Sequence, residues 1–304
     1  FFNDINAQIE ATSDVEPQFF LMFIDLDGFK AINDELGHTA GDYVLKEYSR
    51  RLKEHTTTKN SIIYRMGGDE FVIIFNNKNL ETPLNEMDII KISAELLNIT
   101  NESFYIKKEK RKLSQSIGIA RYKKGATAEE TLMYADTAMY EAKRQGKSRA
   151  VYYSDELHNK VKNRNEIIRL LKIAIKENEF HLVFQPKMVK EKNSNNYFQE
   201  GAEVLMRWES KNLGIVSPQV FIPIAEESGL MSMIDTWLIE ESAKKIKEMK
   251  DKGVNSTFSI NVSAKQFSNI NLPDNFKETL EKYDIHPSAV IIEITESATI
   301  KEPE

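Results

Sequence analysis

The sequence predicts an α/β protein of two domains, an α+β domain followed by a domain of strand–helix units. Its length of 304 residues is about twice that of a typical single domain. Before residue 154, strand-like and helix-like segments alternate irregularly around a hairpin, which is typical of a mixed central sheet with flanking helices. From residue 164 onward they alternate regularly, which favours a (β/α) layered or barrel fold.

The first 153 residues contain six runs rich in β-branched and aromatic residues, which we expect to be strands. They are residues 19–24, 62–64, 71–75, 104–107, 113–120 and, as a short edge strand, 151–153. Apolar residues at helical spacing predict helices. These cover residues 1–10, 31–36, 42–55, 87–97 and 129–143. A polar helical stretch over 154–165 is expected to be a linker, which sets the domains at 1–153 and 166–304.

The second domain shows the same two kinds of pattern in a more regular order. We expect strands over residues 180–185, 201–206, 257–262 and 290–295. We expect helices over residues 167–175, 221–226, 234–250 and 275–283. The segment 187–197 is polar and is expected to be an exposed loop.

Composition argues against several classes of function. The net charge of −6 argues against broad binding of a nucleic-acid polymer or an anionic membrane. The absence of cysteine excludes disulfides, thiolate zinc sites and cysteine nucleophiles. No apolar run approaches the ~18 residues of a membrane span, and no signal peptide is visible. Both ends of the chain look cut, so a membrane or sensor segment upstream stays open.

A pair of glycines, Gly67 and Gly68, separates two of the expected strands and is a strong hairpin signal. Asp69 and Glu70 follow directly. Neighbouring strand residues face opposite sides of a sheet, so the two acids can have different roles. Taken alone, an ordinary hairpin with a solvated acidic tip explains this stretch equally well.

A second acidic pair, Asp25 and Asp27, ends another expected strand. Two acids on one face at a strand end suit a hard divalent cation. A capped, solvated turn is the alternative. The histidine nearby, His38, is by itself more typical of a hydrogen-bonded turn than of a ligand.

Four stretches of the first domain occur in a characteristic order. They are Asp25–Asp34 with Gly37-His38 and Gly41-Asp42, then Gly67–Phe71, Ser116–Ala120 and Ala135–Lys143. Together they resemble the GGDEF family of diguanylate cyclases, which joins two GTP molecules into cyclic di-GMP and releases two pyrophosphates. Each such domain holds one GTP, so the resemblance implies a homodimer that forms through the GGDEF domains. It also implies a cytoplasmic enzyme.

The resemblance also implies roles for individual residues. Asp25, the Leu26 carbonyl and Asp69 would hold Mg²⁺ or Mn²⁺ against the phosphates, because carboxylates beside a triphosphate repel it unless cations intervene. Asp69 or Glu70 would be the base for the 3′-hydroxyl. The remaining implied contacts are Lys30 and Lys143 to phosphate, Asn33, His38 and Asp42 to guanosine, and Gly67 and Gly68 for close approach of the backbone to the nucleotide.

Three departures from the family pattern are visible. Gly146-Lys147-Ser148 stands where the family often has Gly-Arg-Asn, and Lys147 keeps the phosphate-binding charge but loses bidentate geometry. Thr58–Ser61 stands where many members carry Arg-x-x-Asp, so we expect no inhibitory product site of that kind. The family's usual N-terminal block is missing.

Five stretches of the second domain also occur in a characteristic order. They are Gln185-Pro186, Glu203–Trp208, Ser217–Pro223, Asn261–Phe267 and Glu293–Ser297. They resemble the EAL family, whose members have a TIM-barrel-type fold and hydrolyse cyclic di-GMP. Val204 replaces the alanine of the family's namesake motif. A complete barrel needs roughly 250 residues, so we expect residues 166–304 to be only its first part.

The EAL resemblance implies a second metal site and two contacts to the dinucleotide. Glu203, Asn261 and Glu293 would be metal ligands, and all three are hard oxygen donors suited to Mg²⁺ or Mn²⁺. Gln185 and Arg207 would contact cyclic di-GMP, with Arg207 gripping a phosphate.

Three hypotheses about function follow. In the first, the GGDEF domain makes cyclic di-GMP and the EAL domain of the parent protein hydrolyses it to pGpG. In the second, only the phosphodiesterase works, and the GGDEF domain binds GTP to regulate it. In the third, both domains are non-catalytic receptors for cyclic di-GMP.

Overall fold

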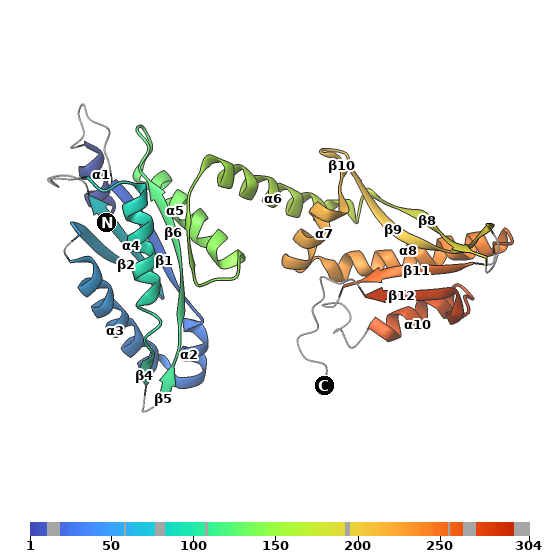
Figure 1. Ribbon diagram of the computed structural model, residues 1–304, viewed down its shortest axis with the longest axis horizontal. Coiled ribbons are helices and arrows are strands. Elements are labelled where there is room, and N and C mark those ends of the chain that lie inside the picture. The colour runs from blue at the N-terminus through green and yellow to red at the C-terminus, as the bar shows by residue number, and fades with distance from the viewer. Residues whose placement is uncertain are drawn as a thin grey trace. The chain divides into compact units, whose positions relative to one another are not determined.

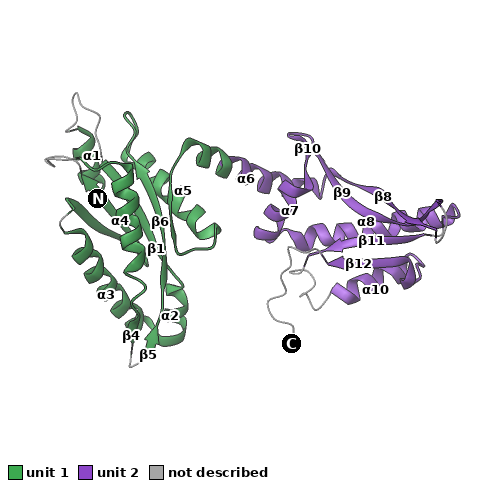
Figure 2. Cartoon of the chain, viewed as in Figure 1, with its two compact units in different colours: residues 1–161 green, residues 162–304 purple. Residues whose placement is uncertain are grey.

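The structure, a computed structural model, describes most of the chain (Figure 1). The described residues are 1–10, 19–57, 59–76, 83–106, 109–191, 195–254, 256–263 and 272–294. Parts of two EAL-like stretches, residues 264–267 and 295–297, therefore lie outside the described residues, as does Thr58. The chain divides into two compact units, residues 1–161 and 162–304 (Figure 2). No helix in the described ranges is long and apolar enough to cross a membrane.

The first unit is built on a five-stranded mixed sheet, which confirms the predicted fold class. The strand order is β2-β3-β1-β6-β7, with every neighbouring pair antiparallel except β6 and β7. The strands are β1 (Phe19–Asp27), β2 (Ser61–Gly67), β3 (Glu70–Asn76), β6 (Ser114–Arg121) and β7 (Arg149–Tyr152). A separate hairpin joins β4 (Phe104–Ile106) to β5 (Glu109–Arg111), of which the sequence predicts only the first strand.

The central strand β1 is buried along its whole length because helices cover both faces of the sheet. The helices are α1 (Phe2–Glu10), α2 (Phe29–Leu36), α3 (His38–Thr56), α4 (Glu86–Asn98) and α5 (Ala128–Arg144). Even-numbered residues of β1 pack in the core shared with α2, α3 and α4, and odd-numbered residues pack in the core shared with α1 and α5. The end of β1 is therefore fixed from both sides, and any side chain placed there is held rigidly.

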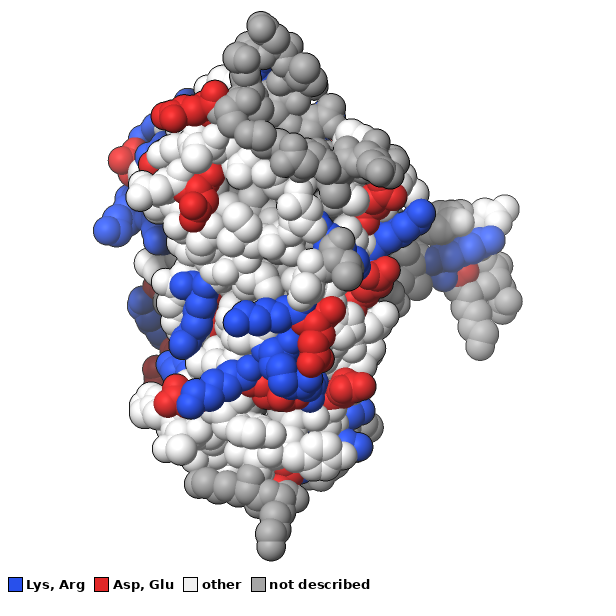
Figure 3. Space-filling view, turned by 90° about the vertical axis from the view of Figure 1, so that its left-hand side faces the viewer, with Lys and Arg blue, Asp and Glu red and all other residues white. Residues whose placement is uncertain are grey.

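The surface of the first unit mixes charges of both signs. On the face shown in Figure 3, Lys and Arg side chains lie beside Asp and Glu side chains. Helix α3 follows this pattern, since Arg50 binds both Glu47 and Glu54. Pairs at this spacing stabilise an exposed helix by about 0.2–0.5 kcal/mol each, so these contacts add a little to the stability of α3.

The second unit contains another five-stranded sheet, in which β9, β11 and β12 are parallel neighbours and β8 and β10 flank β9 antiparallel to it. Helices follow β10 and β11, as the predicted strand–helix alternation requires. The elements are α6 (Asp155–Ala174), β8 (Phe180–Lys190), β9 (Tyr197–Ser210), β10 (Gly214–Val216), α7 (Pro218–Glu227), α8 (Met231–Asp251), β11 (Thr257–Val262), α10 (Leu272–Lys282) and β12 (Val290–Ile294).

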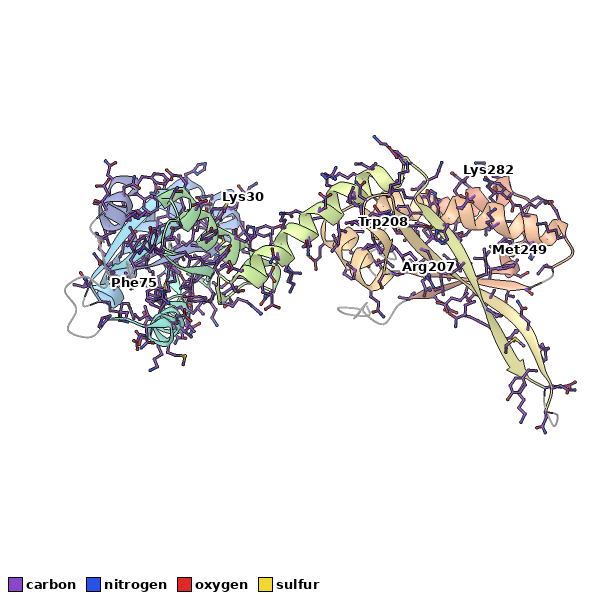
Figure 4. All side chains as sticks on the ribbon, turned by 90° about the horizontal axis from the view of Figure 1, so that it is seen from above. Lys30, Phe75, Arg207, Trp208, Met249 and Lys282 are labelled. Atoms are coloured by element: carbon purple, nitrogen blue, oxygen red, sulfur yellow. The ribbon has the colours of Figure 1, made fainter. Side chains whose placement is uncertain are left out.

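Alternation along β9 separates the core of this unit from its opposite sheet face (Figure 4). Trp208 is fully buried against α7, and its indole N–H donates to Glu179 Oε2 at 3.0 Å. Its neighbour Arg207 is on the other face of the strand, together with Glu203. One face of the sheet thus builds the core, and the other carries the predicted functional residues.

Two expectations about this part of the chain are wrong. The segment 187–197 is not an exposed loop throughout, because β8 continues to Lys190, β9 begins at Tyr197, and Val189 pairs with Phe198. Polar composition does not exclude strands here, because two paired strands form hydrogen bonds between their backbone groups while their side chains stay in water. Residues 154–165 and 167–175 are not separate helices either, since α6 runs unbroken through both. The predicted domain boundaries and linker stay a prediction.

Asp235 on α8 makes the stability of the second unit depend on pH. Burial, followed by the nearby Glu226 carboxylate, raises the pKa of Asp235 to about 7, and its Oδ1 has no hydrogen-bond partner among the described residues. A raised carboxyl pKa stabilises the fold at low pH, and this stability is lost as the pH rises from about 4 through about 7.

We therefore expect Asp235→Asn to raise the free energy of unfolding at pH 8 by about 2 kcal/mol and to flatten its fall between pH 5 and 8. Denaturant unfolding at several pH values checks this. Asp251→Asn, on the exposed end of the same helix, is the matched control and should leave the pH profile unchanged. An equal response of both variants would contradict the assignment.

Candidate functional site

The β2–β3 hairpin places Asp69 at the end of β1. Gly67 pairs with Glu70, so Gly68 and Asp69 form a two-residue turn. Gly68 has a φ of +52°, which glycine adopts without strain. Two contacts hold the turn: Arg65 donates to the Gly68 carbonyl at 2.8 Å, and the Leu26 amide donates to the Asp69 carbonyl at 3.4 Å.

Four of the predicted residues meet at this point. Asp25 is buried and is paired in register with Glu70 across β1 and β3. Lys143, from the last turn of α5, binds Asp25 Oδ2 at 2.6 Å. The structure therefore brings Asp25, Asp69, Glu70 and Lys143 together from β1, the β2–β3 hairpin and α5.

This cluster is short of positive charge. Burial, and after it the charge of Asp25, raises the pKa of both Asp69 and Glu70. Burial also raises the pKa of Asp136 on α5, while Lys143 lowers it and Asp25 raises it. Sequence reasoning gave Asp136 no role, although it lies within one of the family-like stretches, because only the packing of α5 on the sheet brings it near the cluster.

Asp27 has a different environment from Asp25, although both end the same strand. Its two oxygens accept hydrogen bonds from Ser114 and Ser116, each at 2.9 Å, and from the Ser148 amide at 3.3 Å. Asp27 thus anchors the loop after α5, which leaves Asp25 as the strand-end acid that faces the cluster.

The residues predicted to contact guanosine lie where α2 meets α3. A Cβ on Gly41 would lie 2.0 Å from Asn33 Oδ1, so this glycine, one residue before Asp42, lets α3 approach α2 at Asn33. His38 is exposed at the first position of α3 rather than in a turn.

The two remaining predicted cations of this unit are both exposed. Lys30 lies in the first turn of α2, and Lys147 lies beyond α5 with a φ of +62°. Within the described part of the chain, neither side chain contacts the acidic cluster. Their predicted binding of phosphate stays a prediction.

The oxygen donors at the end of β1 suit a hard divalent cation that also takes ligands from a phosphate-containing substrate. Among the described residues, no group of three or more His, Cys, Asp or Glu side chains is arranged as a complete metal cage. Asp25 and Asp69 with the Leu26 carbonyl supply oxygen donors only, as Mg²⁺ prefers, and Mg²⁺ is commonly bound by one or two carboxylates plus substrate phosphates.

In the second unit, the predicted residues share the sheet face opposite the core. Gln185 pairs with Glu203 across β8 and β9, and Asn261 pairs with Glu293 across β11 and β12. Ser259, two residues before Asn261, pairs with Glu203. The Asn261 amide donates to Glu203 Oε1 at 2.6 Å, so this face brings the three proposed metal ligands into one row.

Sequence reasoning missed one residue at this face, Lys187. Its ammonium donates to Ser259 Oγ at 2.7 Å and binds Glu293 Oε1. This contact is the main cause of a lowered pKa of Glu293. The signal that was available is its spacing, because Lys187 lies two residues after Gln185 and hence on the same face of a continuing strand.

Comparison with known families agrees with both resemblances. The model of the diguanylate cyclase GGDEF domain matches residues 1–149, and the EAL domain model matches residues 168–304. Since these two ranges cover nearly the whole chain, it belongs to the proteins that carry a GGDEF domain followed by an EAL domain.

Several known proteins are similar to the chain. It is 31% identical over 287 residues to MucR of Pseudomonas aeruginosa, named a bifunctional diguanylate cyclase/cyclic di-GMP phosphodiesterase, matching 94% of this chain and 40% of MucR. It is 37% identical to the signalling protein YkoW of Bacillus subtilis, matching 92% of this chain and 34% of YkoW. A solved EAL/GGDEF domain protein of M. capsulatus is 32% identical, with 50% of this chain and 96% of that one covered and a TM-score of 0.43.

The chain thus spans well under half the length of the two curated relatives. The prediction that residues 166–304 form only the first part of an EAL domain stays a prediction.

Proposed function

We propose that the first unit condenses two GTP molecules into cyclic di-GMP in the cytoplasm, with Mg²⁺ or Mn²⁺ bound by Asp25, Asp69 and the Leu26 carbonyl. The observation that carries this proposal is the acidic cluster at the end of β1, which burial and mutual repulsion leave in need of a cation. When bound, the cation neutralises triphosphate charge and lowers the pKa of the attacking hydroxyl.

The residues of the chain have complementary tasks in this reaction. Lys30 and Lys143 bind phosphate oxygens, and Asn33, His38 and Asp42 bind the guanosine. Glu70 or Asp69 accepts the proton of the 3′-hydroxyl. Because each unit holds one GTP, two chains face each other as a homodimer in the productive state.

For the second unit we propose a role in hydrolysis of cyclic di-GMP within the whole protein. Glu203, Asn261 and Glu293 form its metal site, and Gln185 and Arg207 contact the dinucleotide. The support is their common sheet face and the match to the EAL family. The name of MucR joins both activities in one relative.

One observation favours a second candidate function, in which the GGDEF domain binds GTP only to regulate the phosphodiesterase. Lys147 replaces an arginine of the family pattern and stands exposed in a left-handed conformation. A lysine there binds phosphate as a point charge without a bidentate grip. A receptor without catalysis is less well supported, since the acids of both units are retained.

The first test is incubation of the purified chain with GTP and Mg²⁺, followed by separation of the nucleotides by chromatography. We expect cyclic di-GMP and pyrophosphate to appear. GTP that binds and stays unreacted would replace the cyclase proposal with the regulatory one.

Gly67 offers a way to separate nucleotide binding from folding. Neither its φ nor its neighbours require glycine, because it lies outside the left-handed region and a Cβ would meet nothing within 4 Å. Because the protein backbone at Gly67 approaches the nucleotide in this proposal, Gly67→Ala should weaken GTP binding about tenfold or more while the melting temperature stays within a degree or so. Calorimetric titration of GTP and a thermal melt check this. Unchanged GTP affinity would remove Gly67 from the binding site.

A further inference from the structure

The second unit supplies a cation of its own at the row of proposed metal ligands. Lys187 reaches from β8 across β9 to Ser259 on β11 and Glu293 on β12. Its partner in the β8–β9 pairing is Gly201, which has no side chain and fits tightly against Thr257. A Cβ at position 201 would lie 2.6 Å from the Thr257 carbonyl oxygen, so the close approach of β9 to β11 requires glycine there.

Lys187 binds a carboxylate that a divalent cation at this row would also need. The ammonium uses a Glu293 carboxylate oxygen, and Ser259 places it level with Glu203, which is paired with Ser259 in register. Glu203 in turn accepts from the Asn261 amide. Both acids of the row therefore have donors from within the chain, and an ammonium beside a divalent cation at one carboxylate would repel it.

We propose that Lys187 is a built-in competitor of the divalent cation at the EAL site. Its ammonium neutralises Glu293 while the site is free of metal, and metal binding displaces it. This inference rests on the proposed metal site of the second unit and adds a residue that sets the metal affinity of that site. Lys187 acts through Glu293 and Ser259, so it is a positioning residue.

Mn²⁺ binding to the intact chain tests the proposal. Lys187→Met keeps the length of the side chain and removes its charge. It should bind Mn²⁺ about three- to tenfold more tightly than wild type, since an ion pair of this partial exposure is weak. Without metal its melting temperature should fall slightly, and Mn²⁺ should raise it more than in wild type. Lys190→Met, an exposed lysine on the same strand, is the matched control and should leave the Mn²⁺ affinity unchanged.

The GGDEF unit also binds metal in our proposal, so Mn²⁺ titrations are carried out in an Asp25→Asn, Asp69→Asn background. Loss of the remaining Mn²⁺ binding in Glu203→Gln, Glu293→Gln locates that binding at the EAL row. Binding that is located there but is equal or weaker in Lys187→Met overturns the role of Lys187 alone. No Mn²⁺ binding at the row, even with Lys187 replaced, overturns both this inference and the proposed metal site.

A measurement on the Lys187 side chain itself needs no substitution at that position. In the same background, lysine acetylation by an amine-reactive reagent is followed by mass spectrometry with and without Mn²⁺. We expect Mn²⁺ to speed the labelling of Lys187 severalfold relative to Lys190, because the displaced ammonium loses its partners. An equal labelling ratio with and without Mn²⁺ would overturn displacement.

Discussion

Asp69→Ala is expected to reduce cyclic di-GMP formation by about a thousandfold or more while the first unit stays folded. Asp69 lies in the turn between β2 and β3 and is fixed to the end of β1 through the Leu26 amide. In the proposed mechanism it holds the metal or receives the proton, and losing several kcal/mol of transition-state stabilisation costs about tenfold per 1.4 kcal/mol. Product formation from GTP and Mg²⁺ is the measurement.

The same substitution should not destabilise the protein. Burial and the charge of Asp25 raise the pKa of Asp69, so its ionised form is disfavoured in the folded state and its removal relieves that cost at pH 8. We expect an unchanged or slightly higher melting temperature. A matched control is Asp34→Ala, an exposed acid on α2 that should leave turnover unchanged. Full turnover in Asp69→Ala would refute the site, and an unfolded protein would refute the charge argument.

Most helices and strands of the first unit could be predicted from the sequence because local patterns fix them, although β5 was missed. The run Phe19–Ile24 predicts β1, and the glycine pair predicts the turn after β2. The meeting of Asp25 with Glu70 could not be predicted from these patterns. It depends on β1 being inserted between β3 and β6, a long-range pairing that local patterns do not specify.

Residues that sequence reasoning missed share a physical cause. Asp136 is brought to the cluster by the packing of α5, and Lys187 by a strand that continues into a polar segment. Both positions depend on tertiary contacts between distant parts of the chain. Conversely, Asp27 looked equivalent to Asp25 in sequence, but the three hydrogen bonds it accepts give it a structural role.

Each unit has a lysine that binds an acidic side chain of its candidate site. Lys143 binds Asp25 in the first unit, and Lys187 binds Glu293 in the second. In each case the acid is a proposed metal ligand, and an ammonium balances its charge. A buried or half-buried carboxylate without a partner is costly, so each lysine stabilises the carboxylate that it contacts.

Gly118→Ala is expected to have the largest effect on stability, lowering the free energy of unfolding of the first unit by about 3 kcal/mol or more. Gly118 lies in β6 directly under α5, and a Cβ there would lie 1.9 Å from the Ala135 carbonyl oxygen and 2.2 Å from the Met139 amide nitrogen. These are backbone atoms that no rotamer change can move, so the whole helix must shift away from the sheet.

The shift should also reduce catalysis, because α5 carries Lys143 to the end of β1. Denaturant unfolding together with GTP turnover measures both effects. Gly67→Ala is the matched control for stability, since it makes the same substitution in the same sheet where a Cβ meets open space. We therefore expect the two variants to differ in stability. Gly118 is required by the packing of α5 on the sheet, whereas Gly67 is required only by the nucleotide in our proposal. Equal stability of the two variants would show that α5 is not held against β6 as closely as these distances require.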